Sequence, residues 1–203
     1  MKMPFFSTKN GVFLFGGNMG AISNTKNNIL RITYSAACVA LAMFLPFLTW
    51  QDTAFGNIFS LMHIPVFLCG FLCGWQWGAV VGFVSPLLRF LIFAKPPMPT
   101  ALAMAFELCV YGLVAGILYK ILPKKNLFLY VSLIGAMVVG RFAGGAAMFV
   151  IAGIKGTGYT MATFFTSYFV NAIPGIVLHI ILVPLIVMAL KNANLMPAAS
   201  KEK

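Results

Sequence analysis

The chain has 203 residues, of which 61% are hydrophobic and 8% are charged, and its mean hydropathy is +0.97. A soluble globular domain carries about 25% charged residues, so this chain lacks the polar side chains that a water-facing surface needs. The formal net charge of +11 would suit nucleic acid or a membrane surface, but a nucleic-acid binder needs a soluble basic face and none is present. Long apolar runs between short polar breaks predict an all-α integral membrane protein.

The apolar runs predict six transmembrane helices in one membrane domain, residues 28–191. We expect these spans at 28–50, 57–73, from a turn at 74–77 to Phe93, 101–122, 127–152 and 163–190. A tail of 27 residues precedes the domain, and residues 192–203 follow it. The first tail either lies on the membrane interface through its phenylalanines or is disordered. Its apolar run is too short for a cleavable signal.

Basic residues predict the orientation of the chain. Lys95 and Lys155 fall in loops on one side of the predicted bundle. Ten others fall on the side of the two tails: Lys2, Lys9, Lys26, Arg31, Lys120, Lys124, Lys125, Lys191, Lys201 and Lys203. Because cytoplasmic loops carry an excess of Lys and Arg, both termini are predicted to be cytoplasmic.

Five polar residues within the spans fall at one predicted depth. They are His63, Arg89, Glu107, Arg141 and Asn171. A helical rise of about 1.5 Å per residue puts each of them about 10 Å below the outer surface. Polar groups at such a depth are costly and need a partner or a purpose. His179 is expected deeper, about 22 Å from the outside, as packing or as a helix–helix hydrogen bond.

These residues have two interpretations. In the structural one, Glu107 neutralises Arg89 or Arg141, or the arginines extend to the interface. In the functional one, two arginines and one glutamate leave a positive charge unmatched, which is too costly for mere packing. We therefore expect a carboxylate ligand that enters from outside, with an arginine as its bidentate partner.

Four cysteines lie in apolar runs, namely Cys38, Cys69, Cys73 and Cys109. Cys69 and Cys73 share a predicted helix face near His63, so a metal site can be imagined. Buried packing by free thiols is the favoured interpretation, and no metal or cofactor is predicted.

Catalytic chemistry has no support in the sequence. Only three residues are acidic, and no phosphate-binding, zinc-protease or serine-hydrolase motif is complete. A membrane enzyme that acts on lipid or prenyl substrates would need metal-binding acids near the cytoplasmic face. That enzyme, and a structural membrane subunit without a ligand, are the alternatives to transport.

Three segments carry a resemblance to a known family. They are LMHIPVFLCG at 61–70, SPLLR at 85–89 and AMAFE at 103–107. The chain resembles the substrate-binding S components of energy-coupling factor (ECF) vitamin transporters, a family of bacterial cell-membrane importers. The likeness covers all six predicted spans and is densest over 57–120. Among these proteins the chain is most similar to the pantothenate-type S components, and folate, riboflavin, cobalamin and biotin are other substrates of the family.

The resemblance implies a six-helix bundle with cytoplasmic ends and an outward-opening vitamin site under the loops 51–56 and 94–100. Because of their common depth, we expect the five polar residues named above to bind the substrate. The resemblance also implies partnership with a transmembrane coupling subunit and two cytoplasmic ATPases, which hydrolyse the ATP. The family's small-residue contact with the coupling subunit maps onto Ala36 and Ala40.

Overall fold

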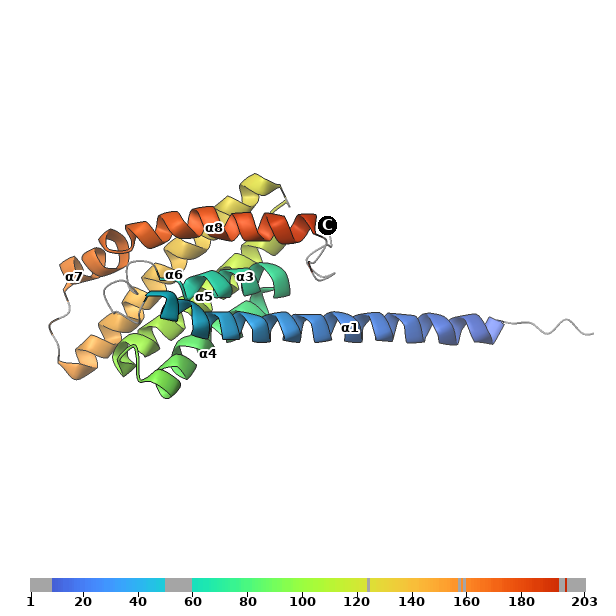
Figure 1. Ribbon diagram of the computed structural model, residues 1–203, viewed down its shortest axis with the longest axis horizontal. Helices are drawn as coiled ribbons and strands as arrows, with labels where there is room; N and C mark the ends of the chain where they lie inside the picture. The colour runs from blue at the N-terminus through green and yellow to red at the C-terminus, as the bar shows by residue number, and fades with distance from the viewer. Residues whose placement is uncertain are drawn as a thin grey trace, which may run out of the picture.

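The computed structural model describes residues 9–49, 60–123, 125–156, 158, 160–193 and 196. Every regular element within these residues is helical, as the apolar runs predict (Figure 1). The elements are α1 (Lys9–Phe44), η1 (Leu45–Thr49), α3 (His63–Cys73), α4 (Trp75–Phe93), α5 (Met98–Ile121), α6 (Asn126–Lys155), α7 (Met161–Phe165), η2 (Thr166–Val170) and α8 (Ile173–Asn192).

Within the described residues, five helical stretches are long and apolar enough to cross a membrane. They are Asn27–Phe47, Trp75–Phe93, Met98–Ile121, Asn126–Lys155 and Met161–Asn192. These stretches match five of the six predicted spans, and the chain is a multi-pass membrane protein by this criterion. The cytoplasmic position of both termini stays a prediction, because the length and composition of a helix do not define its direction across a membrane.

The predicted second span, 57–73, differs from the other five. Its helix α3 has 11 residues, which corresponds to a length of about 16 Å, or half of the apolar core of a bilayer. All 11 residues are buried, between α1, α4, α5 and α8 (Figure 1). This burial on every side shows that α3 lies inside the bundle and not at its lipid face. Residues 57–59 lie outside the described part of the chain.

Helix α1 begins well before the predicted first span. It runs without a break from Lys9, so the disorder considered for the first tail does not apply to residues 9–27. Figure 1 shows this part of α1 projecting beyond the other helices. The segment contains no proline, and adding residues to an existing helix is easier than starting a new one. Its position on the membrane surface remains a prediction.

Glycines bring the backbones of α3, α4 and α5 into direct contact. A Cβ added at Gly70 would lie 2.8 Å from the Gly112 carbonyl oxygen, and one at Gly78 would lie 2.7 Å from the Gly70 Cα. No side chain fits at either point, so small residues are required for this close approach. Gly74 has another role, since its φ of 97° makes the turn from α3 into α4.

The last apolar stretch is a helix that is interrupted near one end. Residues 166–170 form a π-helical turn in which the Asn171 amide donates to the Thr166 carbonyl at 2.9 Å. Pro174 follows near the start of α8 and has no amide hydrogen to donate. The interruption therefore leaves carbonyl groups without their regular helical donors. Such irregular backbone at membrane depth is tolerated where it is buried or lines a cavity.

Candidate ligand-binding site

A cavity of about 280 Å³ opens where α3, α5, α6 and η2 meet. It approaches the lower end of the usual size range for small-molecule sites, about 300–1,000 Å³. Its lining mixes polar groups with two methionines and consists of Ser60, His63, Thr100, Met104, Glu107, Arg141, Met148, Ser167, Tyr168, Asn171 and Ala172. Four of the five predicted site residues thus lie on one cavity: His63, Glu107, Arg141 and Asn171.

Arg89 is the predicted site residue that does not line this cavity. Its guanidinium carbon lies 6.0 Å from the centroid of the Phe47 ring and 5.9 Å from that of Phe93. Its Nη1 donates to the Met43 carbonyl at 3.5 Å. Cation–π contacts and this carbonyl therefore accommodate the charge beside α1 and η1. Depth along a helix predicts the height of a residue but not the direction in which its side chain points.

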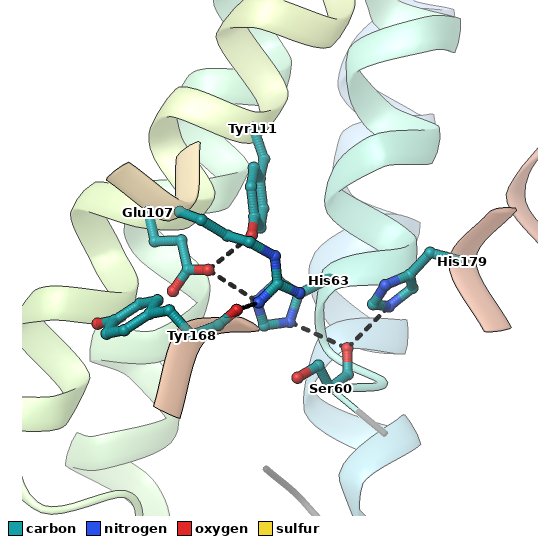
Figure 2. A network of polar contacts seen from close by, with 7 residues as sticks. Ser60, His63, Glu107, Tyr111, Tyr168 and His179 are labelled. Atoms are coloured by element: carbon teal, nitrogen blue, oxygen red, sulfur yellow. Dashed lines mark hydrogen bonds and ion pairs between the residues drawn. The ribbon is translucent and has the colours of Figure 1, made fainter. Parts of the chain in front are cut away.

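The Glu107 carboxylate has two neighbours on the same oxygen. The Tyr111 hydroxyl donates to Oε1 at 2.6 Å, and His63 Nε2 lies 3.9 Å from that atom (Figure 2). Glu107 and Tyr111 are four residues apart on α5 and therefore share a face. Neither arginine lies within ion-pair distance of Glu107 in the described part of the chain. The partners of Glu107 are a phenol and an imidazole.

Two glycines of α6 leave space for the side chains of Glu107 and Tyr111. A Cβ added at Gly144 would lie 2.8 Å from the Glu107 Cβ and 3.0 Å from its Oε2. Gly140, one turn earlier, faces the Tyr111 ring in the same way. The Tyr111 ring also stacks on Phe67 of α3, with centroids 4.9 Å apart. The two side chains are thus held between α3 and α6, which fixes the direction of the carboxylate.

Arg141 connects α6 to the interrupted helix. Its Nη1 donates to the main-chain carbonyl of Tyr168, which lies in the π-helical segment. Arg141 is 5% exposed, and its buried Nε has no hydrogen-bond partner in the described part of the chain. A buried donor without a partner costs free energy unless a ligand or water supplies one. Arg141 therefore lines the cavity with a guanidinium whose donors the described residues satisfy only in part.

The charge balance of the site differs from the predicted one. The expected surplus of one positive charge counted both arginines, and Arg89 lies elsewhere. The cavity wall itself carries one guanidinium, Arg141, and one carboxylate, Glu107. When the nearby imidazoles are neutral, the formal charges of these two side chains sum to zero. An anionic ligand would therefore give the site a net negative charge.

Two histidines converge on one carbonyl at the start of α3. His63 Nδ1 lies 2.9 Å from the Ser60 carbonyl oxygen, and His179 Nε2 lies 3.2 Å from it (Figure 2). The two rings are 5.7 Å apart. His179 therefore lies beside the site. Helical rise alone predicts a position well below the site. That estimate assumed one straight helix, whereas the last span is interrupted and α3 begins inside the bundle.

Several site groups were missed in the sequence. Tyr111 could have been found, because it follows Glu107 by the four residues that align side chains on a helix. The carbonyls of Ser60 and Tyr168 carry no side-chain signal. Their roles depend on a turn and on a π-helical segment, which the residue types do not specify.

The cysteines pack between helices. Cys69 Sγ lies 3.5 Å from Ser35 Oγ, and Cys73 Sγ donates to the Arg31 carbonyl at 3.5 Å, which ties α3 to α1. Within the described residues, no three His, Cys, Asp or Glu side chains are arranged to hold a metal ion.

Comparison with known proteins identifies a family. The chain matches the family described as ECF transporter, substrate-specific component, over residues 13–187. No curated protein and no solved structure matches it. The matched segment contains every cavity-lining residue and reaches into all five stretches of membrane-spanning length. The chain therefore belongs to the family of substrate-specific components of ECF transporters.

Proposed function

We propose that this substrate-specific component captures pantothenate in the cavity formed by α3, α5, α6 and η2. The observation that carries the proposal is the buried Arg141 guanidinium, whose Nε lacks a partner in the described residues. A guanidinium offers parallel N–H donors that match a carboxylate, and pantothenate has one carboxylate. Family membership supports the role of a transport subunit with a small-molecule substrate, while the identity of the vitamin is our proposal.

The rest of the cavity suits the rest of the molecule. Pantothenate joins its carboxylate to an amide and two hydroxyls through a short, branched aliphatic body. Met104 and Met148 offer adaptable apolar contacts to that body. The side chains of Thr100, Ser167 and Asn171 offer hydroxyl and amide partners.

Cavity size supports pantothenate over two other vitamins carried by this family. Folate and cobalamin are considerably larger molecules than pantothenate, and a cavity of about 280 Å³ favours the smaller ligand. Ligand sites usually bury most of the surface of their ligand, so a bulky vitamin would need a larger enclosure.

Transport requires partner subunits, and we propose that the coupling subunit contacts α1 at Ala36 and Ala40. Both side chains are exposed, whereas Ser35, Cys38 and Ala42 are buried on the side of α1 that meets the bundle. Small exposed residues allow another helix to approach closely. In this proposal two cytoplasmic ATPases supply the energy, and this chain supplies the specificity.

Equilibrium binding to the purified chain tests the proposed function. Labelled pantothenate is expected to bind with a micromolar or lower Kd, and excess folate, riboflavin or biotin is not expected to displace it. Mass spectrometry of ligands that co-purify with the chain gives an independent identification. If pantothenate fails to bind while another vitamin co-purifies, the proposed substrate is wrong.

A further inference from the structure

We propose that the site takes up one proton together with its anionic ligand, and that this proton resides on His63 Nε2, facing Glu107 Oε1. The inference rests on the proposed function, because it requires that the ligand be an anion. It adds a second, ionic species to what the subunit binds.

The hydrogen bond at Ser60 determines which nitrogen of His63 is available. A carbonyl oxygen can only accept, so the His63 Nδ1 that lies 2.9 Å from it carries a hydrogen. In the neutral ring, Nε2 then carries a lone pair and no hydrogen. This nitrogen lies 3.9 Å from Glu107 Oε1, another acceptor. Two acceptors face each other, and a proton on Nε2 turns the arrangement into an ion pair.

His179 is the other imidazole nearby, and its surroundings oppose a charge. Its Nε2 donates to the same Ser60 carbonyl, and it is 1% exposed. Its buried Nδ1 has no hydrogen-bond partner within the described residues. A proton there would create a buried charge without a counterion, whereas a proton on His63 faces a carboxylate.

The other ionisable groups around the pair come from α5, α6 and η2. The Tyr111 hydroxyl donates to Glu107 Oε1, so this oxygen serves as an acceptor. Arg141 lines the same cavity and bonds the Tyr168 carbonyl, while the Tyr168 side chain comes from the π-helical segment. The carboxylate thus remains the counterion that an imidazolium would need.

Charged and titratable groups on α1 and α4 are directed elsewhere. Arg31 lies at the opposite end of α3, where its carbonyl accepts from Cys73, and Tyr34 and Cys38 follow it along α1. Arg89 of α4 contacts aromatic rings and the Met43 carbonyl. None of these side chains lines the cavity.

Charge neutrality supplies the driving force. The cavity wall carries one cation, Arg141, and one anion, Glu107, so a bound carboxylate leaves a net charge of −1. Uncompensated charge at membrane depth is costly, and the cost rises if the occupied site is carried across the bilayer. A proton on His63 restores neutrality. Ligand and proton therefore stabilise each other's binding, and this coupling is reciprocal.

Calorimetry of pantothenate binding at pH 7 in phosphate and in Tris, whose ionisation heats differ, measures proton uptake directly. We expect about one proton taken up per ligand, with a Kd that rises towards about tenfold per pH unit in alkaline buffer. Binding with no difference between buffers and no pH dependence overturns the proposal. Absence of pantothenate binding would instead contradict the proposed function, so the two failures are distinguishable.

Variants locate the proton. His63→Gln and Glu107→Gln should each abolish the uptake, since each removes one member of the pair. His179→Gln keeps a donor for the Ser60 carbonyl and should retain the uptake. If His179→Gln loses the uptake while His63→Gln retains it, the proton resides on His179 and the assignment is overturned.

A ligand-free measurement tests the pair even if pantothenate does not bind. The Cε1–H NMR signal of His63 is followed against pH in the wild type and in Glu107→Gln. Removing the facing carboxylate should lower the pH at which His63 takes up its proton. An unchanged midpoint would show that the two groups do not share a proton and would overturn the proposal.

Discussion

Arg141 of α6 donates a hydrogen bond to the main-chain carbonyl of Tyr168, which lies in the π-helical turn of the last span. This contact joins a regular helix to the irregular backbone that forms one wall of the cavity. It uses one nitrogen of the guanidinium and leaves Nε buried without a partner in the described residues. The irregular segment and the unsatisfied donor belong to a single arrangement, and it gives the cavity its cationic end.

The two membrane-embedded arginines should respond differently to the same conservative change. Arg141→Lys keeps the charge but removes the planar pair of donors, so pantothenate binding should weaken by about ten- to a hundredfold. Arg89→Lys is the matched control, because Arg89 packs against the rings of Phe47 and Phe93 and lies outside the cavity. Its Kd should change by less than about threefold. Equal losses in both variants, measured by equilibrium binding, would point to folding and contradict a ligand contact at Arg141.

Gly144 should be required for the position of Glu107. In Gly144→Ala the new Cβ would lie 2.8 Å from the Glu107 Cβ, so the carboxylate must shift. Overpacking of this kind costs about 1–3 kcal/mol and should lower both the melting temperature and the affinity for the ligand. Gly153→Ala in the same helix meets nothing within 4 Å. It should leave binding unchanged, and a similar loss there would show that helix geometry, not Glu107, is responsible.

Removal of the Tyr111 hydroxyl should destabilise the protein, even when the contacts of the Tyr111 ring are kept. Tyr111→Phe preserves stacking on Phe67 but removes the donor to Glu107. Leaving a buried carboxylate without this donor should cost about 1–3 kcal/mol in thermal unfolding experiments. Tyr130→Phe, on α6 and outside the cavity lining, serves as the control. If the two variants unfold at the same temperature, the hydrogen bond does not stabilise the site.

The exposed small residues of α1 should separate transport from binding. Ala36→Trp or Ala40→Trp places a bulky ring on the face proposed for the coupling subunit. Uptake by cells that contain the complete transporter should be lost, while the purified subunit should still bind its ligand. Val150→Trp, at an exposed position on α6, is the control and should transport normally. Loss of binding in the α1 variants would argue against the proposed contact.

Much of the fold could be predicted from apolar run length. The spans that end near Phe93 and Leu190 were predictable because each run is long enough to cross the apolar core. The short helix α3 was not, since a run of similar hydropathy can be buried in a bundle or can face lipid. The identity of α3 as an inner helix depends on packing against four neighbours, which hydropathy does not encode.

The site could be predicted in part, for a related reason. Helical rise predicts height within the membrane, and three of the residues that share a predicted height, His63, Glu107 and Arg141, line one cavity. Helical rise does not predict the direction in which a side chain points. Arg89 therefore shares the predicted height of the other three, although its side chain contacts Phe47. Main-chain acceptors such as the Ser60 carbonyl were beyond prediction, because every residue has one.

The proposed capture of a carboxylate by Arg141 is tested most directly by comparing pantothenate with panthenol, in which an alcohol replaces the carboxylate. Both ligands are titrated into the purified wild-type chain under the same conditions. Pantothenate is expected to bind about a hundredfold more tightly than panthenol, because only the carboxylate can form the charge-assisted pair with the guanidinium. Equal affinity for the two, or binding of neither, would contradict the proposed site.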